Sequence, residues 1–264
     1  MKKLRLLIVC STLFFFTSCF DTIEEFTINE DGSGEYSMKM DMFRMIEMMS
    51  EMGGKDNLSK NKDYNEVKDS SFLFKDFINE ADNLTAEEKA LFHDGRFNMH
   101  MNMKEKEMFV NYAFPFKNRG DLSKIYSNGP KALEAIGKKI KPEGEGDAAA
   151  EKGSQNTMMP KPGATNDAFK GGEFFDLTHD KGVFSKKAKV AAIKEYAAKD
   201  STLKQMMPML GSAYSITIVH LPRPAKKVDH PYARLSEDKK TVTLKFPISD
   251  YFERPEVMDF KIEY

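Results

Sequence analysis

The stretch from residue 97 to residue 116 constrains the fold most, because apolar and polar residues alternate in two runs around a short turn. Residues 104–107, between the runs, are Lys-Glu-Lys-Glu. Successive side chains of a strand point to opposite faces, so this pattern predicts an antiparallel hairpin with one face on a core and one in water. The alternating apolar residues are Phe97, Met99, Met101 and Met103 in the first run, and Met108, Val110, Tyr112, Phe114 and Phe116 in the second.

Other segments show the same period of two. Hairpins are predicted around residues 31–34, Asp-Gly-Ser-Gly, and around residues 179–182, His-Asp-Lys-Gly, because a glycine-containing turn between alternating runs is a strong hairpin signal. Further strands are predicted towards the end of the chain. The apolar residues of all these segments are Phe26, Ile28, Tyr36, Met38, Met40 and Met42; Phe175, Leu177 and Phe184; Tyr214, Ile216 and Ile218; Val242, Leu244, Phe246 and Ile248; and Met258, Phe260, Ile262 and Tyr264.

Apolar residues spaced three and four apart predict helices between these strands. Residues 55–70 are polar and are predicted to form a loop. Because strands outnumber helices and helices lie between hairpins, we predict an α+β fold: a mostly antiparallel sheet built from hairpins, with helices packed on one face. The predicted helices cover residues 42–52; 74–81; 85–92, with a Thr85–Glu88 capping box; 121–139, capped by Asp121; and 187–210, the longest, ended by Gly211.

Residues 141–171 differ from the rest of the chain, since Pro, Gly, Ala, Ser, Asn and charged residues dominate them. Such a composition buries too little apolar surface to offset the entropy lost on ordering. We therefore predict a disordered insertion at about 141–171 within a single domain that spans residues 19–264, because neither flank alone holds a full sheet and a covering helix.

The N-terminus predicts a secretion signal that ends in a lipidated cysteine. Positive residues precede an apolar run from Leu6 to Phe16, which is shorter than the roughly 20 residues that a membrane-spanning helix needs. Phe16-Thr17-Ser18-Cys19 resembles the bacterial lipobox, with Phe16 at the usual leucine position. We predict that residues 1–18 are removed and that Cys19 is lipidated; the alternative is an ordinary secretory signal with a stray cysteine.

Charge and cysteine content narrow the classes of function. The signal carries Lys2, Lys3 and Arg5, so the predicted mature chain has 37 basic and 41 acidic residues and a formal charge of −4. This balance argues against nucleic-acid binding, which requires a clustered basic surface. Cys10 leaves with the signal and Cys19 is consumed by lipid, so the mature chain is predicted to hold no disulfide, thiolate metal site or cysteine nucleophile.

Residues 19–36, Cys-Phe-Asp-Thr-Ile-Glu-Glu-Phe-Thr-Ile-Asn-Glu-Asp-Gly-Ser-Gly-Glu-Tyr, resemble the start of a family of uncharacterised lipoproteins from Bacteroidetes-type bacteria. They are more distantly similar to the LppM-type lipoprotein domain, which also starts with a strand, an Asp-Gly-x-Gly turn and a strand. Residues 218–222 and 238–243 are similar to the closing strands of that domain, with Arg223 where the family usually has glycine. The resemblance implies an envelope protein without a known activity and transfers no functional residues.

Methionine is the one unusual component, with 18 residues, and two Met-x-Met-x-Met runs lie at 38–42 and 99–103. Thioethers bind Cu(I), so an extracytoplasmic copper protein is one interpretation. We favour core packing, because spacing of two on a strand is what a buried face requires and methionine fills irregular cores. We predict no bound metal and no cofactor.

No motif predicts a catalytic site. Residues 31–35 resemble the start of a calcium loop, but Met42 stands where its bidentate glutamate belongs. The segment 221–227, Leu-Pro-Arg-Pro-Ala-Lys-Lys, is interpreted as an irregular strand exit or a recognition segment. The five histidines lack metal-binding spacings; they are His93, at a helix end, His100, facing away from the methionines, His179, in a turn, His220, and His230, in a loop.

These patterns predict a membrane-anchored envelope lipoprotein, with Cys19 as the only candidate site residue. Because Phe20, not aspartate, follows the lipidated cysteine, we favour the outer membrane. The mature domain is predicted to be a non-catalytic module that binds an envelope protein, glycan or lipid with its sheet or with the groove beside its helices. The alternatives are an envelope hydrolase with a site assembled in the fold and a methionine-based copper protein.

Overall fold

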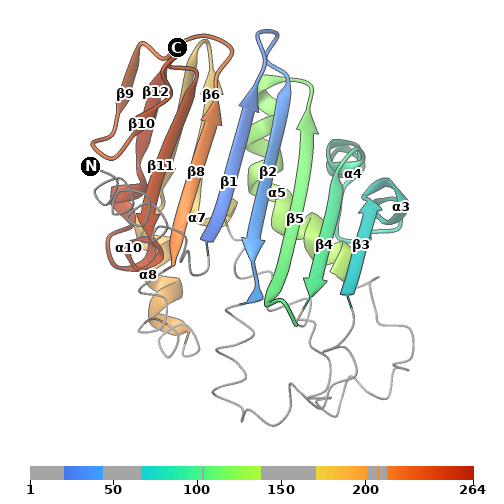
Figure 1. Cartoon of the computed structure of the whole chain (residues 1–264). Coiled ribbons are helices and arrows are strands. Elements are labelled where there is room, and N and C mark those ends of the chain that lie inside the picture. Colours follow the sequence, from blue (N-terminus) through green and yellow to red (C-terminus); the bar gives the residue numbers. More distant parts are fainter. Residues whose placement is uncertain (1–20, 44–66, 103, 138–170, 201–206, 208–212) are drawn as a thin grey trace, which may run out of the picture.

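The computed structural model describes residues 21–43, 67–102, 104–137, 171–200, 207 and 213–264. Its largest element is an eight-stranded sheet (Figure 1). Every neighbouring pair in this sheet is antiparallel except β1 and β8, so the mostly antiparallel sheet predicted from sequence is confirmed. In spatial order the strands are β10 (Arg234–Leu235), β11 (Thr241–Pro247), β8 (Tyr214–His220), β1 (Asp21–Ile28), β2 (Gly34–Asp41), β5 (Glu107–Phe116), β4 (Arg96–Asn102) and β3 (Val67–Leu73).

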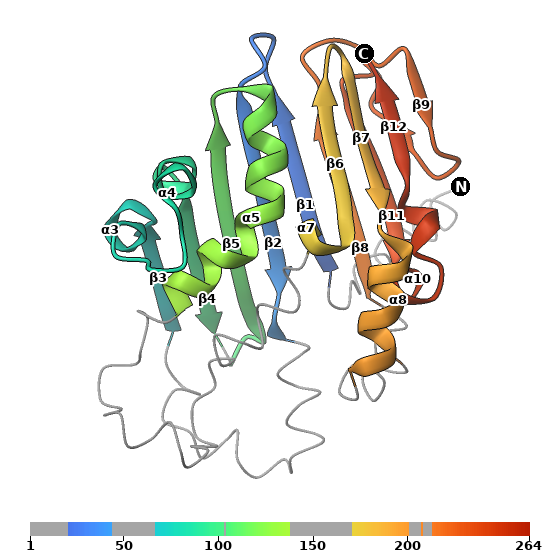
Figure 2. The same ribbon diagram turned by 180° about the vertical axis from the view of Figure 1, so that it is seen from behind.

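A second, four-stranded sheet lies behind the β8 and β11 end of the first (Figure 2). Its strands, in order, are β6 (Phe175–Asp180), β7 (Val183–Ala188), β12 (Phe260–Glu263) and β9 (Lys227–Asp229). Several of these strands are predicted from the sequence, but as part of a single sheet. Two sheets form because β7, β12 and β9 pair with one another and their apolar sides face the first sheet.

Helices cover the same inner face of the large sheet, as predicted, while its outer face is turned to the viewer in Figure 1. The long helix α5 packs against β5 and β6 and lies beside the second sheet, in the layer that covers the inner face of the first (Figure 2). The helices are α3 (Lys75–Ile78), α4 (Ala86–Phe92), α5 (Arg119–Gly137), α7 (Gly171–Phe174), α8 (Val190–Lys199) and α10 (Ile248–Glu253), with a 3-10 turn at Pro255–Met258.

The three predicted hairpins are confirmed. In the β4–β5 hairpin, Met99 lies opposite Val110 and Met101 opposite Met108, so the alternating apolar residues share one face. The β1–β2 turn contains Gly32 at φ 85° and the β6–β7 turn contains Gly182 at φ 81°, a backbone region that glycine adopts without strain. The α4 capping box is also present, with Thr85 and Glu88 each bonded to the other's backbone N–H.

Several predicted boundaries are wrong, and two residues predicted in strands, Ile248 and Met258, lie in α10 and in the 3-10 turn. The loop predicted over residues 55–70 overlaps β3, where Val67–Ser70 pair with β4. The predicted helix 187–210 begins later and ends at Lys199, because β7 continues to Ala188 and Asp200 is extended. Helix α5 begins at Arg119, so Asp121 lies in its first turn and accepts hydrogen bonds from Asn118 instead of capping from outside. Among the described helices α5, not α8, is the longest.

The face of β8 is also reversed relative to expectation. Ser215, Thr217 and Val219 are buried against the core, whereas Ile216 and Ile218 are half-buried on the outer face. The reason is pairing with β1: in this parallel register Thr217 lies beside Glu24 and Val219 beside Phe26, whose side chains point inward. Because the side-chain period is two, the register alone decides which set of residues meets the core.

Two predicted segments fall largely outside the described residues. They are the helix over residues 42–52, of which only Met42 and Phe43 are described, and the insertion at about 141–171, of which only Gly171 is described. None of the described helices has both the length and the apolar character needed to cross a membrane.

Candidate functional site

The structure describes the chain from Asp21, so Cys19 lies outside the described residues and its predicted lipidation is not tested. Asp21 is the first residue of β1, a central strand of the eight-stranded sheet. A chain anchored at Cys19 would therefore enter the sheet after a single intervening residue. This proximity makes the end of the sheet at Asp21 the membrane-proximal end of any anchored form.

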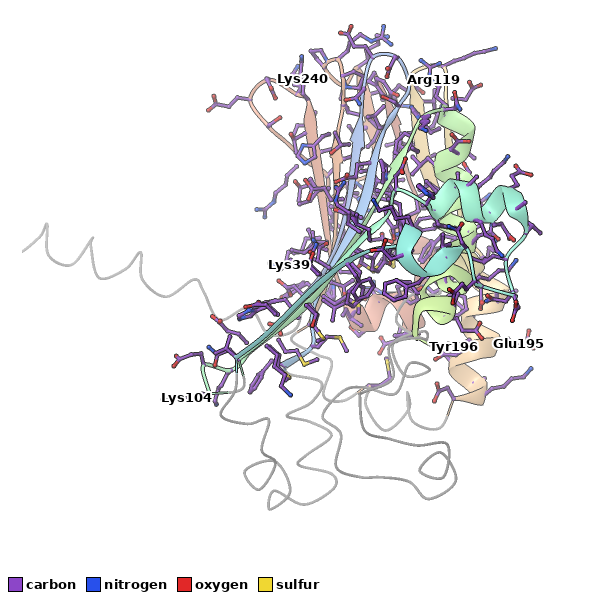
Figure 3. The ribbon with its side chains drawn as sticks, turned by 90° about the vertical axis from the view of Figure 1, so that its right-hand side faces the viewer. Lys39, Lys104, Arg119, Glu195, Tyr196 and Lys240 are labelled. Carbon is purple, nitrogen blue, oxygen red and sulfur yellow. The ribbon has the colours of Figure 1, made fainter. Side chains whose placement is uncertain are left out.

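The outer face of the large sheet is the main candidate binding surface, and Figure 3 shows the molecule edge-on, with Lys39 on this face and Glu195 of α8 on the helix side. Its centre is apolar and half-buried, because Ile23 of β1 lies next to Ile216 of β8 and Ile218 lies one step along. No described helix or strand covers these residues.

Charged and polar pairs surround this apolar centre. On one side His220 Nε2 lies 2.6 Å from Glu25 Oε1, and His220 Nδ1 lies 3.2 Å from Thr241 Oγ1. On the other, Lys245 Nζ lies 3.9 Å above the centre of the Tyr214 ring. An apolar centre inside a polar rim is the usual anatomy of a protein–protein interface.

Further along the same face, a shallow hollow of about 270 Å³ lies over β3, β4 and β5, where His100 sits between two carboxylates. Its Nδ1 is 2.8 Å from Asp69 Oδ1 and its Nε2 is 3.4 Å from Glu107 Oε2. The hydrogen bond that His100 Nδ1 donates to the Asp69 carboxylate is the main reason why the pKa of His100 is raised, with Glu107 adding to the effect.

This geometry bears on the hydrolase alternative. A catalytic histidine needs one ring nitrogen for an orienting carboxylate and the other for the nucleophile or water. In His100 both nitrogens face carboxylates, which favours a protonated imidazolium over a general base. The Phe109 ring beside it is flanked by His100 and, at 4.7 Å, by Lys39 Nζ, so this ring offers little free surface for stacking against a ligand.

The most unusual electrostatic feature is a buried ion pair between the two sheets. Glu24 of β1 and Lys186 of β7 are 4% and 3% exposed, and Lys186 Nζ donates to Glu24 Oε2. Glu24 also accepts a hydrogen bond from Tyr126 of α5 at 3.1 Å, and Thr217 Oγ1 of β8 lies 3.5 Å away. Four elements far apart in the sequence thus meet at one carboxylate.

Aromatic rings pack around this ion pair. Lys186 Nζ lies 4.4 Å from the centre of the Phe175 ring and 5.6 Å from that of Tyr126, so part of its charge faces π-systems. Burial raises the pKa of Tyr36, Tyr126 and Tyr251 well above the ordinary value, and the negative charge of Glu24 raises it further. These hydroxyls stay protonated at physiological pH and serve as neutral hydrogen-bonding groups.

Glu24 and Lys186 were not singled out from the sequence, although a signal was present. Glu24 shares its strand face with Phe26 and Ile28, and Lys186 shares its face with Phe184 and Ala188. In both cases the signal was a charged residue at a position of an alternating strand that is otherwise occupied by apolar residues. Their meeting could not be predicted, because it depends on how the two sheets stack.

The described methionines of the two runs lie in the core, as predicted. Met38, Met40, Met99 and Met101 are each at least 93% buried, on the inner faces of β2 and β4. The Met38 sulfur accepts a hydrogen bond from the Tyr112 hydroxyl at 3.1 Å, so it has a protein partner. The turn at residues 31–34 is a hairpin turn in which Asp31 accepts from the Ser33 N–H and hydroxyl.

The five histidines are not brought together. His93 ends α4 beside Asp94, and His230 Nε2 lies 2.8 Å from the Val257 carbonyl oxygen. The prediction that His179 lies in a turn is wrong, because β6 continues to Asp180 and His179 points into the core, 5% exposed. In the described part of the chain no three His, Cys, Asp or Glu side chains are grouped to hold a metal ion.

Comparisons with known proteins give one weak structural similarity. No family model matches the chain, and no curated protein matches it. Among solved structures, the NMR structure of the folded domain of the Mycobacterium tuberculosis LppM protein is similar with a TM-score of 0.35 and 8% sequence identity, over 96% of this chain and 94% of that one. This is a weak structural likeness to a lipoprotein domain; it carries no argument about function, and a Bacteroidetes-type family has no support from it.

Proposed function

We propose that this chain is a lipid-anchored envelope protein whose domain, residues 19–264, is a non-catalytic module that binds a protein partner on the outer face of its eight-stranded sheet. The observation that carries the proposal is this face itself. It is broad, it is not covered by any described element, and it has an apolar centre of Ile23, Ile216 and Ile218.

The position of the face relative to the predicted anchor supports this role. Because β1 begins at Asp21, the strands rise from the membrane-proximal end and the outer face stands alongside them. A partner in the envelope could therefore reach the face without entering the bilayer. The rim pairs Glu25–His220 and Asp21–Lys245 would orient such a partner more than they would hold it, because exposed ion pairs contribute little free energy.

Lipidation is tested first. In the full-length chain, Cys19→Ala should abolish incorporation of a labelled fatty acid and release the protein from the membrane fraction. Cys10→Ala, a change of the other cysteine in the chain, is the matched control and should keep both label and membrane association. Retention of the label in the Cys19→Ala chain would contradict the proposal, and density-gradient separation of envelopes would test the outer-membrane location.

The binding face is tested by site-specific photocrosslinking in intact bacterial envelopes. A photoreactive residue replaces Lys39 on the outer face or, as control, Glu195 on the exposed side of α8 (Figure 3). We expect a discrete protein adduct from position 39 and none from position 195. Adducts only with glycan or lipid, or equal adducts from both positions, would show that the proposed partner or face is wrong.

A further inference from the structure

At the end of the molecule away from Asp21, α5 begins and β6, β8 and β12 end, which brings four residues near one another. They are Arg119, the first residue of α5; Arg223, which follows β8; His179 of β6; and Tyr264, which follows β12. We call this group the distal mouth. In Figure 1 it lies at the top, beside the β1–β2 turn and the end marked C, and Figure 3 labels Arg119 there.

The backbone leaves room for Arg119. A Cβ built on Gly32, in the β1–β2 turn, would lie 2.7 Å from Arg119 Cγ and 2.8 Å from Nε, so the arginine stem packs directly over this glycine. Gly32 has φ 85°, which strains any other residue. Arg119 is half-buried, and it forms no hydrogen bond or ion pair with another residue that the structure describes.

Arg223 approaches the same place from the other sheet. Its guanidinium carbon lies 5.9 Å from the centre of the Tyr264 ring. Arg223 and Arg119 both lower the pKa of the Tyr264 hydroxyl against the larger opposing effect of burial, so both positive charges lie near this oxygen. Like Arg119, Arg223 has no carboxylate partner among residues 21–43, 67–102, 104–137, 171–200 and 213–264.

His179 supplies a buried, unsatisfied polar atom beside Tyr264. Its Nε2 lies 2.7 Å from the Tyr264 hydroxyl, but its buried Nδ1 has no hydrogen-bond partner in the described part of the structure. Burial, with a smaller effect of Arg119, lowers the pKa of His179 to about 4, so the ring is neutral. When Tyr264 donates to Nε2, Nδ1 carries the hydrogen and is a donor in need of an acceptor.

Three acidic residues near this end are engaged elsewhere, whereas Asp180, next to His179 in the chain, raises the pKa of that histidine. Asp31 accepts from Ser33, Asp121 accepts from Asn118, and Glu263 pairs with Lys261 at 2.7 Å. Lys226 adds a further positive charge, since its Nζ donates to the Tyr264 carbonyl oxygen at 3.2 Å. The distal mouth therefore combines several donors with no acidic group bonded to either arginine.

We propose that the distal mouth binds a phosphate group, with Arg119 and Arg223 as its charged ligands and the Nδ1–H of His179 as a neutral donor, which the hydrogen bond from the Tyr264 hydroxyl to Nε2 keeps in that tautomer. Guanidinium groups bind the oxygens of phosphate through paired, charge-assisted hydrogen bonds, which are stronger than neutral ones. The eight residues of β1 separate this end from Asp21 by roughly 26 Å of strand. The phosphate therefore belongs to a soluble molecule or a partner, and not to the membrane that would hold Cys19.

The test measures binding of inorganic phosphate to the purified full-length chain by titration calorimetry, with nitrogen chemical shifts of histidine side chains as a second readout. Arg119→Gln and Arg223→Gln should each weaken binding by about tenfold or more, the loss expected for one charge-assisted hydrogen bond. Arg234→Gln, which changes an exposed arginine of β10, is the matched control and should bind as the wild type does. Added phosphate should also shift the Nδ1 resonance of His179.

Several results would overturn the proposal. They are no binding at millimolar phosphate, equal binding by all three variants, or phosphate binding that leaves His179 unchanged. The source of the phosphate is tested with the Cys19→Ala chain and vesicles of phosphatidylglycerol or phosphatidylcholine. If neither kind of vesicle competes with soluble phosphate for the chain, the ligand is a soluble one. Binding only to phosphatidylglycerol vesicles would contradict that assignment. Circular dichroism of each variant shows that the fold is retained.

Discussion

The inner face of the eight-stranded sheet is covered in two different ways. Over β2, β5 and β4 the cover is helical, and the buried side chains are apolar or aromatic, with Met38, Met40, Met99 and Met101 among them. Over β1 and β8 the cover is a second sheet, and the buried residues include the ion pair of Glu24 with Lys186. The part of the core beneath the second sheet is therefore more polar than the adjoining part beneath the helices.

The difference shows how the type of cover affects what a core can hold. Helix α5 reaches Glu24 with a single hydroxyl, that of Tyr126, while the facing strand β7 places a full charge against it. A buried charge needs an oppositely charged partner and further hydrogen bonds. For Glu24 the partner comes from β7 and a hydrogen bond comes from α5, both in the layer that covers the inner face of the large sheet. We infer that the ion pair specifies how the two sheets are stacked, whereas the methionine half relies on shape and volume.

The largest expected effect comes from breaking the ion pair on one side. Lys186→Met should lower the free energy of unfolding by about 3–5 kcal/mol, because it leaves the Glu24 carboxylate buried without its cation. Urea unfolding followed by circular dichroism measures the change. The double variant Glu24→Leu with Lys186→Met removes both charges and should recover most of the loss. If the single variant is as stable as wild type, the pair does not hold the sheets as we infer.

The second effect depends on pH and on His179 in the sheet-covered half. Its folded pKa of about 4 lies below the ordinary value of 6.5. Well above pH 6.5 the ring is neutral in both the folded and the unfolded chain, so the protonation of His179 takes nothing from the stability of the fold. As the pH falls from 6.5 towards 4 the unfolded chain takes up a proton that the folded chain does not, and about 3 kcal/mol of stability is lost.

The difference in unfolding free energy between wild type and His179→Gln isolates this effect, because glutamine does not titrate while other groups titrate in both chains. We expect this difference to be constant above pH 7. Between pH 6.5 and 4 the wild type should lose stability relative to the His179→Gln variant. A difference that is flat over the whole range would mean that His179 is more accessible to protons than its burial indicates.

A smaller effect is expected in the helix-covered half. Met99→Leu and Met101→Leu conserve volume on a buried face, so each should change the free energy of unfolding by less than about 1.5 kcal/mol. Denaturant unfolding measures this change, and Cu(I) titration with a colorimetric competitor tests the alternative role. Tight Cu(I) binding that disappears in the leucine variants at unchanged stability would contradict packing as the reason for these methionines.

The smallest effect is expected from deleting residues 145–166, within the predicted insertion. The entropy of loop closure changes slowly with length, so the deletion should change stability by less than about 1 kcal/mol. Limited proteolysis should cut this segment first and leave fragments that stay associated through the shared sheet. Fragments that separate would show two domains, and a deletion that unfolds the protein would show that the segment packs on one half of the core.

The sequence-based predictions succeeded where the interacting residues are close together in the chain and failed where they are far apart. Hairpins such as β4–β5 were predicted because the turn and both strands are adjacent in the chain. Strand β3 was missed because Lys68-Asp69-Ser70-Ser71 has no alternation, and it is a strand only because β4 offers it an edge. The end of α8 was missed because periodicity in the sequence continued beyond the residue at which the backbone becomes extended.

The sequence by itself determined the local elements: the hairpins, the α4 capping box and the burial of the methionine runs, all of which depend on neighbouring residues and on side-chain period. Only the tertiary structure decided the parallel pairing of β1 with β8, the separate second sheet, and hence the meeting of Glu24 with Lys186. The parallel pairing and the ion pair join residues more than 160 positions apart in the chain. Their formation depends on the registers and stacking of whole sheets, which no local pattern specifies.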